Sequence, residues 1–479
     1  MKATPRFDVT GEPPALLDLG HVHLIAIGGA GMSAVARLLL ARGVQVSGCD
    51  RNASAALEAL AEQGATVVVG HDPAHLADVD TVVVSSAIPA AHPELLAASE
   101  RGIRVLHRAQ ALATVTSGRR RIAIAGANGK TTTTSMVAVA MAAAGLDPVL
   151  ASGGDVAALG GNARWGSGDA VIEADESDGS FLAYRPDIAV VTNVQPDHLD
   201  FYGDAAGVEA GYAAFVDTMP RSGVLIACAD DPGALRLADY ARGRGLRVLS
   251  YGQSPSADAV ISEVRAQGLG MTASLTVGDQ VVPLVLAVPG LHNVSNAAAA
   301  YLVVTEVLGA GAAEVLRGLR EFGGAARRFE VRGEVGGVTV VDDYAHNAPK
   351  VAALVTAARV VAGTHRLRAI FQPHLFSRTR DFAGDFAQAL AGVDDLAILD
   401  IYAAREEPMP GVSSETIGSV LRDLPGERRL LVGAGRQESV AFVLDGVRPG
   451  DLVLTIGAGD VTKLGADLLT ALAGREDAG

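Results

Sequence analysis

The chain has 479 residues and a formal net charge of −15, with 49% hydrophobic and 4% aromatic residues. Its length suggests about three domains of roughly 150 residues each. The acidic balance argues against a nucleic-acid backbone as partner, because such binding needs basic patches. No apolar run suggests a membrane span, residues 1–20 lack a signal-peptide core, and two cysteines make neither a disulfide framework nor a cysteine metal cluster. We therefore expect a cytoplasmic protein with no membrane partner.

Short apolar runs alternate with longer segments rich in Ala and Leu along the whole chain. This alternation of strands and helices predicts α/β domains with parallel sheets, which bind ligands at the carboxyl ends of their strands. Residues 257–287 alternate more like antiparallel strands. The runs predict buried strands at 21–27, 44–50, 81–87, 121–127, 169–176, 187–193, 337–345, 366–374, 395–404 and 451–459.

The first glycine-rich turn is IGGAGMSA, residues 27–34, between a predicted strand and a predicted helix. Gly29, Gly31 and Ala34 match G-x-G-x-x-A, and Asp50 ends the following strand. Such glycines let the backbone approach a diphosphate at the N-terminus of a helix, and the acid can bind a ribose hydroxyl. The pattern predicts a diphosphate ligand, either a dinucleotide or a nucleotide sugar. Ser85 and Ser86 follow another strand of this sheet and either add hydroxyl contacts or form an ordinary loop.

The second glycine-rich turn is GANGKTTTT, residues 126–134. It follows a strand and precedes an apolar helix, as a phosphate loop does, but only two residues separate Gly126 from Gly129 where the usual pattern has four. The chemical parts are all present, since Lys130 can reach the β- and γ-phosphates and the Thr131 hydroxyl can face Mg²⁺. The stretch therefore predicts nucleotide binding.

Acidic residues are dense after the next two strands of the same predicted sheet. Carboxylates at strand ends are costly to bury unless they are solvated or bound to cations, so this density favours a magnesium site. Histidine is an unusual ligand for this hard cation, and spacing alone leaves the role of His198 open. The residues are Glu173, Asp175, Glu176 and Asp178, then Asn193, Asp197, His198 and Asp200.

Linker-like stretches at 116–121 and 321–330 divide the chain into domains at 1–116, 117–325 and 326–479. The predicted fold class is α/β with three domains. A Rossmann-like N-terminal sheet precedes a central sheet with the phosphate loop of an ATPase, and a second Rossmann-like sheet follows at the C-terminus.

The ordered motifs resemble those of the Mur ligases, ATP-dependent enzymes that form amide bonds in cell-wall peptide synthesis. These motifs are GANGKTTT, EADESDGSF, TNVQPDHLD, PGLHNVSNAAAA, RRFE and DDYAHNAPK. The segments IGGAGMSA, SSAIP, FQPHLFSRTRDF and GAGDVTKL are most similar to members that join L-alanine to UDP-N-acetylmuramate. The resemblance runs from about residue 20 to about residue 465 and implies that the two glycine turns serve two ligands, a UDP-sugar and ATP.

The resemblance also implies a role for particular residues. ATP would contact Gly126, Ala127, Asn128, Gly129, Lys130, Thr131, Thr132, His292, Asn293, Asn296, Arg327, Arg328 and Asp343. Mg²⁺ would be bound by Thr131, Glu173 and His198. The UDP-sugar would contact Gly29, Ala30, Gly31, Met32, Ser33, Asp50, Ser85 and Ser86. L-Alanine would lie among Tyr344, His346, His374 and Arg378, and the catalytic set would be Lys130, Glu173, His198, Arg328 and His346.

Three features depart from the family pattern. Leu375 stands where some relatives have arginine, and Asn347 stands where many have histidine. Several sister ligases use a modified lysine as a magnesium bridge, but no lysine lies between Lys130 and Lys350. The first two departures concern the amino-acid pocket rather than the reaction.

Other functions remain open from the sequence. A sister ligase that adds a tripeptide to the same sugar is the nearest alternative, followed by a dinucleotide oxidoreductase with an added nucleotide-binding domain and by a non-catalytic regulatory module. The sequence leaves open whether the amine is alanine, glycine or serine. We expect a monomer or a weak homodimer.

Overall fold

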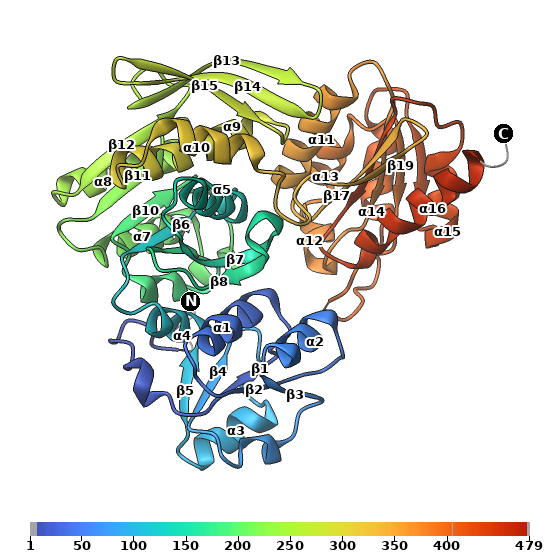
Figure 1. Ribbon diagram of the computed structural model, residues 1–479. Coiled ribbons are helices and arrows are strands. Elements are labelled where there is room, and N and C mark those ends of the chain that lie inside the picture. The colour runs from blue at the N-terminus through green and yellow to red at the C-terminus, as the bar shows by residue number, and fades with distance from the viewer. Residues whose placement is uncertain (1–6, 405, 477–479) are drawn as a thin grey trace. The chain divides into compact units, whose positions relative to one another are not determined.

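The computed structural model describes residues 7–404 and 406–476, so the first six residues of the segment inspected for a signal peptide lie outside the described part. The described residues form three sheets (Figure 1). The chain divides into two compact units. One holds the first sheet and most of the second, and the other is built mainly of residues from Gly323 onward. No helix in the described residues is both long enough and apolar enough to cross a membrane.

The first sheet is a five-stranded parallel sheet that positions the first glycine turn. Its order is β3 (Thr66–Val69), β2 (Val46–Asp50), β1 (Val22–Ile25), β4 (Thr81–Val84) and β5 (Arg104–His107). Its helices are α1 (Ala30–Ala41), α2 (Ala55–Glu62), α3 (Pro93–Glu100) and α4 (Arg108–Val115). The strand order reverses between β1 and β4, so the glycine turn after β1 and the serines after β4 lie at the switch point where such sheets bind ligands.

The second sheet has ten strands in the order β15-β14-β13-β12-β11-β10-β6-β9-β7-β8. The strands are β6 (Arg121–Ala125), β7 (Val149–Val156), β8 (Gly161–Arg164), β9 (Ala170–Glu173), β10 (Ile188–Val191), β11 (Val224–Cys228), β12 (Arg247–Gly252), β13 (Ala259–Gln267), β14 (Gly270–Val277) and β15 (Gln280–Leu286). The helices are α5 (Lys130–Ala143), α6 (Leu199–Tyr202), α7 (Ala205–Asp217), α8 (Pro232–Gly243), α9 (Leu291–Tyr301) and α10 (Ala312–Glu321). Neighbouring strands β13, β14 and β15 are joined by two-residue turns, which confirms the antiparallel prediction for 257–287.

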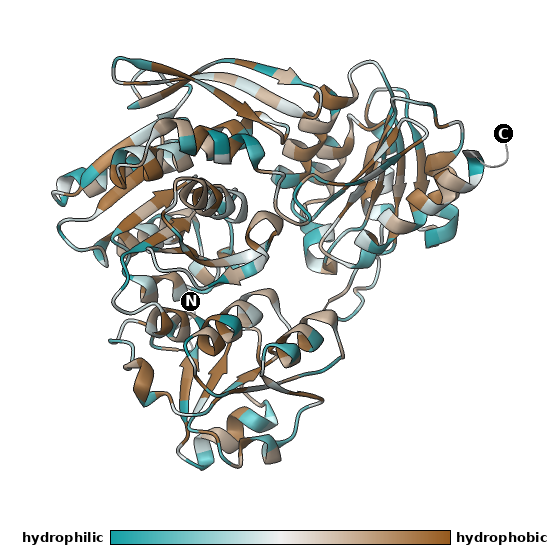
Figure 2. Ribbon diagram, in the orientation of Figure 1, coloured by the Kyte–Doolittle hydropathy of each residue, from teal (hydrophilic) through white to brown (hydrophobic). Residues whose placement is uncertain are grey.

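Strand β6 lies inside this sheet, between β10 and β9. Its residues from Ile122 to Ala125 are fully buried, and α5 is buried from Thr131 to Met141 because it packs between the sheet and α10. The brown strands of Figure 2 show this apolar interior. Burial of this strand and helix fixes the phosphate loop between them.

The third sheet forms the core of the second unit. Its order is β16 (Glu330–Val335), β17 (Val338–Asp343), β21 (Leu452–Ile456), β18 (Leu367–Phe371), β19 (Asp395–Ile398) and β20 (Arg429–Val432), with only the β16–β17 pair antiparallel among these strands. One apolar cluster packs α11 (Ala348–Ala362), α13 (Ala383–Leu390) and α14 (Glu415–Asp423) on the strands. A second cluster packs α15 (Arg436–Leu444) and α16 (Leu464–Glu476), and the short helix α12 (Phe376–Asp381) follows β18.

Each of the ten predicted strands is confirmed, and the three-domain α/β class is confirmed. The predictions extended past most strands into the polar residues that follow them. They missed several strands, among them β3, whose side chains are largely exposed, and β7, which contains a Gly153-Gly154 pair. The domain limits at 116 and 325 stay predictions.

A buried arginine anchors the amino ends of the central strands of the third sheet. Arg368 is 1% exposed, and its guanidinium lies 3.0 Å from Asp451 and 3.2 Å from Asp395. It also donates to the backbone carbonyls of Val443, Asp445 and Gly446. These contacts tie together β18, β19 and β21, and the predicted site residue His374 follows the opposite end of β18.

We expect Arg368→Leu to destabilise the second unit by about 3–5 kcal/mol, because it leaves buried carboxylates without their partner. Arg366→Leu is the matched control: Arg366 contacts the same Asp395 at 2.9 Å, but its side chain is 47% exposed, so its loss should cost about 1 kcal/mol or less. Thermal unfolding followed by circular dichroism measures both. Equal midpoints for the two variants would contradict this role for Arg368.

Candidate nucleotide and UDP-sugar site

The phosphate loop follows β6 and turns sharply into α5. Gly126 and Gly129 both have positive φ, 134° and 88°, which favours glycine. A Cβ on Gly126 would lie 2.0 Å from Thr192 Oγ1, and one on Gly129 would lie 2.9 Å from Asn296 Oδ1. Both glycines of the shortened loop are therefore required by conformation and by close packing.

Side chains at the end of the neighbouring strand β10 hold the loop in place. Asn193 Oδ1 accepts a hydrogen bond from Asn128 N at 2.9 Å, and Asn193 Nδ2 donates to Asn128 O at 3.0 Å. Thr192 Oγ1 donates to the same Asn128 carbonyl at 2.5 Å. Because these groups fix the loop from outside, the N–H groups at the start of α5 stay directed at the loop's interior.

Lys130 is the first residue of α5, and its ammonium points back into the loop. Nζ donates to Gly126 O at 2.7 Å and lies 2.8 Å from a carboxylate oxygen of Glu176, which is 2% exposed. Burial disfavours the lysine charge, but the attraction of Glu176 outweighs it and raises the pKa of Lys130. Burial also raises the pKa of Glu176, against the effect of Lys130. The pair keeps a cation at the position where a phosphate would bind.

Oxygen and nitrogen ligands suited to a cation lie beside this lysine. Thr131 Oγ1 donates to Glu173 Oε1 at 2.9 Å, and Glu173 Oε2 accepts from Gly153 N at 2.6 Å. His198 has a left-handed backbone, φ 53°, and its Nε2 lies 3.8 Å from Glu176 Oε1. Glu173 ends β9, Thr131 is the second residue of α5, and His198 is the N-cap of α6 in the segment that follows β10. A carboxylate and a hydroxyl suit a hard cation, so Thr131 and Glu173 fit the predicted ion, and His198 stays a predicted ligand.

The first glycine turn is held by different constraints. Its left-handed residue is Ala26, with φ 59°, whereas Gly29 has φ −65° and starts α1 as its N-cap. Asp50 Oδ2 accepts from Gly28 N at 3.0 Å, so this acid already braces the turn. A Cβ on Gly31 would lie 2.8 Å from Arg108 Nη1. Close approach to Arg108, rather than positive φ, explains Gly31.

Arg108 joins the two glycine-rich sites. Its guanidinium packs against Gly31 and donates to Asp175 Oδ2 at 2.7 Å. Burial disfavours the charge of Asp175, but Arg108 and then Lys130 outweigh it and lower its pKa. Arg108 at the first turn and Lys130 at the second thus contact adjacent residues, Asp175 and Glu176, inside the first unit.

Two further contacts link the same elements. Ser86 Oγ donates to Asp178 Oδ2 at 2.5 Å, and His107 Nε2 lies 3.4 Å from that oxygen. Asn162 Nδ2 donates to Ala30 O at 2.7 Å and to Ser33 Oγ at 3.1 Å. Ser86 and Ser33, both predicted to contact the UDP-sugar, thus also form hydrogen bonds to residues that belong to the predicted central domain.

In the second unit, the RRFE segment clasps the end of β17. Arg327 Nε lies 3.1 Å from Asp342, and its Nη2 donates to Gly457 O at 2.5 Å. Asp343 accepts from Phe329 N at 2.8 Å and Ala345 N at 2.7 Å, and burial raises its pKa despite the nearby Arg328. The guanidinium of Arg328 lies 5.3 Å from the Tyr344 ring centre. Because the Arg327 guanidinium already contacts Asp342 and the Gly457 carbonyl, Arg328 is the better candidate for a contact with phosphate.

The residues predicted for the amino-acid pocket also lie together. The ring centres of His346 and Tyr344 are 5.1 Å apart, and those of His346 and His374 are 5.9 Å apart. Arg378 Nη1 donates to His346 O at 3.2 Å. His346 Nδ1 donates to Tyr344 O at 2.9 Å. Burial, then repulsion from Lys350, lowers the pKa of His346 to about 3, so it is a neutral imidazole and a weak base.

Both departures in this region have local structural roles. Asn347 is the N-cap of α11, and its Oδ1 accepts from Lys350 N at 3.0 Å. Leu375 precedes α12 with a left-handed backbone, φ 71°, and its N donates to Tyr402 O at 3.0 Å. Among the remaining predicted ATP contacts, Asn296 packs beside Gly129, while Asn293 Nδ2 donates to Pro289 O at 2.7 Å and His292 packs against Gly290.

Sequence reasoning missed Arg108, Asn162 and Thr192 as site residues, and it did not identify Glu176 as the partner of Lys130. Arg108 follows β5, and Thr192 follows β10, so both stand at the carboxyl ends of parallel strands. This position is the signal that could have identified them. No pattern marks Asn162, because its partners lie in α1.

Comparison with known proteins gives the family. Three family models match: "Mur ligase family, catalytic domain" at residues 21–120, "Mur ligase middle domain" at 124–304 and "Mur ligase, glutamate ligase domain" at 327–459. The UDP-N-acetylmuramate–L-alanine ligase of Kineococcus radiotolerans is 53% identical, over 98% of this chain and 100% of the relative. That of Renibacterium salmoninarum is 49% identical, over 96% and 97%.

Solved structures with a similar fold belong to the same kind of ligase. The UDP-N-acetylmuramate-alanine ligase MurC from Thermotoga maritima is 26% identical with a TM-score of 0.81, covering 95% of this chain and 99% of that one. A murein peptide ligase from Psychrobacter arcticus is 25% identical with a TM-score of 0.70, over the same shares. Since the family models span most of the chain and the relatives nearly all of it, this chain belongs to the Mur ligase family.

Proposed function

We propose that this chain joins L-alanine to the lactyl carboxylate of UDP-N-acetylmuramate and converts ATP to ADP and phosphate. The observation that carries the proposal is a pair of contacts at adjacent residues. Arg108, which packs against Gly31, contacts Asp175, and the next residue, Glu176, contacts Lys130 of the phosphate loop. These contacts support one site for the two anion-binding turns. A reaction between a sugar-borne acid and a triphosphate needs that proximity. The relatives at 45–53% identity carry this activity in their names.

On this proposal, residues 126–132 bind the phosphates of ATP and Asn296 lies on the side of Gly129. Lys130 exchanges part of its contact with Glu176 for phosphate oxygens. Thr131, Glu173 and His198 are the residues that would hold Mg²⁺, which supplies charge neutralisation for the transferring phosphoryl group. The family is ATP-dependent, whereas magnesium and its ligands belong to the proposal.

The first domain would bind the UDP-sugar at the switch point of its sheet. The N-terminus of α1 offers N–H groups to the diphosphate, and residues 29–33 with Ser85 and Ser86 line the approach. Asp50 braces Gly28 and can also reach a ribose hydroxyl. Arg108 adds a cation beside Gly31, which would attract either the diphosphate or the lactyl carboxylate.

The chemistry has two steps. A carboxylate oxygen attacks the γ-phosphorus, the bond to ADP breaks, and an acyl phosphate forms. The neutral amine of alanine then attacks the acyl carbon, the carbon–oxygen bond to phosphate breaks, and the amine loses a proton. The first step brings two anions together, and Lys130 with the loop N–H groups offsets their repulsion. Arg328 would contact phosphate when the third domain covers ATP.

The second unit would admit the amino acid among Tyr344, His346, His374 and Arg378. With a pKa of about 3, His346 is poorly suited to take the amine proton near neutral pH. We therefore assign it an orienting role and leave proton acceptance to the phosphate of the substrate. Cytoplasmic location and a monomeric or weakly dimeric state stay predictions.

The function is tested by measuring phosphate release with ATP, UDP-N-acetylmuramate and one amine at a time. We expect the highest kcat/KM with L-alanine, lower values with glycine and L-serine, and negligible turnover with the tripeptide of the recycling reaction. Omission of the sugar or of the amine is the control. Preference for the tripeptide would support the sister ligase, and no turnover with any amine would support a non-catalytic module.

Lys130→Met should distinguish the role of the phosphate loop from that of the first glycine turn. We expect kcat to fall about 10²- to 10³-fold or more, because a cation aimed at the transferring charge is lost, while the affinity for UDP-N-acetylmuramate in calorimetry stays nearly unchanged. Lys463→Met, at an exposed lysine, is the matched control.

Since Lys130→Met leaves Glu176 buried without its partner, the double variant Lys130→Met/Glu176→Gln tests whether lost folding explains the result. It should recover thermal stability but not activity. Equal loss of sugar binding and turnover in both variants would refute the division of labour between the turns.

His346→Gln should leave the shape of the pH profile unchanged. The depressed pKa keeps His346 neutral at all pH values above about 3, so it contributes no inflection between about pH 5.5 and about pH 9. We expect a raised KM for L-alanine instead, measured as kcat and KM across this range. Disappearance of a wild-type inflection near neutral pH would restore His346 as the general base.

A further inference from the structure

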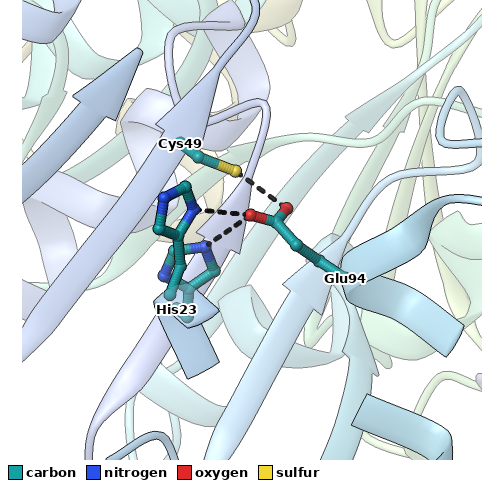
Figure 3. A group of neighbouring side chains, drawn as sticks. His23, Cys49 and Glu94 are labelled. Atoms are coloured by element: carbon teal, nitrogen blue, oxygen red, sulfur yellow. Dashed lines mark hydrogen bonds and ion pairs between the residues drawn. The ribbon is translucent and has the colours of Figure 1, made fainter. Parts of the chain in front are cut away.

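A buried group of imidazoles and a thiol converges on one carboxylate in the first domain. We call it the Glu94 cluster. Glu94 lies in α3, is fully buried and stands at the centre of the cluster. The side chains around it are those of His23, Cys49, His71, His75 and His92. Figure 3 shows His23 and Cys49 directed at the Glu94 carboxylate. The proposed reaction uses none of these residues.

Four ligand atoms of the Glu94 cluster lie close enough to share one ion. One atom each from His23, Cys49, His75 and Glu94 lie within 4.8 Å of one another. Cys49 Sγ is 3.0 Å and His75 Nδ1 is 2.8 Å from Glu94 oxygens, and His23 Nε2 is 3.9 Å away. In a tetrahedral zinc site with one sulfur, ligand atoms lie about 3.3–3.6 Å apart. Small side-chain shifts would therefore suffice.

Hydrogen bonding within the protein leaves part of this group unsatisfied. His23 is 1% exposed, and its Nε2 has no hydrogen-bond partner among the described residues. Its Nδ1 lies 2.9 Å from Ser47 Oγ, which in turn lies 2.8 Å from His21 Nε2. Such a second contact fixes the ring and is typical of a metal-ligating histidine. A buried polar nitrogen aimed at a carboxylate beyond hydrogen-bond distance is costly without a ligand.

A purely hydrogen-bonded core is the competing interpretation. It accounts for Cys49 and His75, which both contact Glu94 directly. It does not account for His23 Nε2, nor for the two ring nitrogens of His92, which are also buried without hydrogen bonds in the described residues.

We propose that the Glu94 cluster is a structural zinc site in which His23, Cys49, His75 and Glu94 bind one Zn²⁺. A thiolate, two imidazoles and a carboxylate form a donor set that selects zinc over the hard cation proposed for the ATP site. Binding replaces the proton of the Cys49 thiol, which leaves for solvent, with a sulfur–zinc bond. His71, whose Nδ1 lies 3.1 Å from Cys49 Sγ, flanks the site.

The ligands come from four separate elements. His23 lies in β1, Cys49 in β2, His75 in the short helix Pro73–Leu76 and Glu94 in α3. An ion would thus fasten the strand pair that carries the glycine turn to its covering helix. Cys49 also precedes Asp50, which braces Gly28. The expected consequence is stability of the first domain.

Cobalt titration of the tag-free, chelator-treated chain tests the proposal. Tetrahedral Co²⁺ bound to a thiolate gives visible d–d bands and a near-ultraviolet charge-transfer band, so we expect both to saturate near one equivalent and to be displaced by Zn²⁺. The chain has two cysteines, both buried. Cys49→Ser should abolish the charge-transfer band, and Cys228→Ser, the matched control, should retain it.

The titration contains excess Mg²⁺, which keeps Co²⁺ from the metal position proposed for the ATP site. That position offers no thiolate, so Co²⁺ bound there would give no charge-transfer band. His75→Gln keeps the thiol and should weaken Co²⁺ binding at least tenfold. Zn²⁺ should raise the thermal unfolding midpoint of the wild type and of Cys228→Ser but not of Cys49→Ser. No charge-transfer band in the wild type, or a band that persists in Cys49→Ser, would overturn the proposal.

Discussion

The structure of the candidate site depends on two cations that stand against a dense group of carboxylates. Glu173 ends β9, Asp175, Glu176 and Asp178 follow it, and Glu176 is buried, with 2% of its side chain exposed. Such a group would be expelled or protonated without cations. Lys130 compensates Glu176 from the phosphate loop, and Arg108 compensates Asp175 from the first domain. Lys130 belongs to one glycine turn and Arg108 packs against the other. The acidic residues at the end of β9 therefore contact both turns through these two cations.

The three sheets place their polar residues by one shared rule. Each parallel strand ends where its apolar run ends, and the following residues are free to be polar because they leave the core. The loop after β6, Asn193 after β10 and Glu173 at the end of β9 meet for this reason. Asp343 at the end of β17 and His374 after β18 follow the same pattern in the second unit. The predicted site residues thus gather at the carboxyl ends, where open parallel sheets bind ligands.

The local parts of this site were predictable from the sequence, whereas the partnerships between distant residues were not. Gly126, Lys130 and Thr131 follow one another along the chain, so spacing alone predicts a phosphate loop. The Arg108–Asp175 contact joins residues far apart in sequence, and its existence depends on how two domains pack. The Glu94 cluster was invisible for the same reason: its residues are scattered over two strands, a loop and two helices with no metal-ligand spacing. Counting cysteines alone argued against a metal cluster, because the count ignored buried histidines.

The pairing of Lys130 with Glu176 also bears on how the shortened loop would bind the triphosphate of the proposed reaction. A loop shorter by two residues has fewer N–H groups to offer, so the charge of the lysine would matter more to the binding. A buried lysine without a partner would lose its charge. Glu176 prevents this, because it raises the pKa of Lys130, and the Gly126 carbonyl fixes where the ammonium points. The cation is thus charged and oriented before any phosphate arrives, and little reorganisation is left to the binding step.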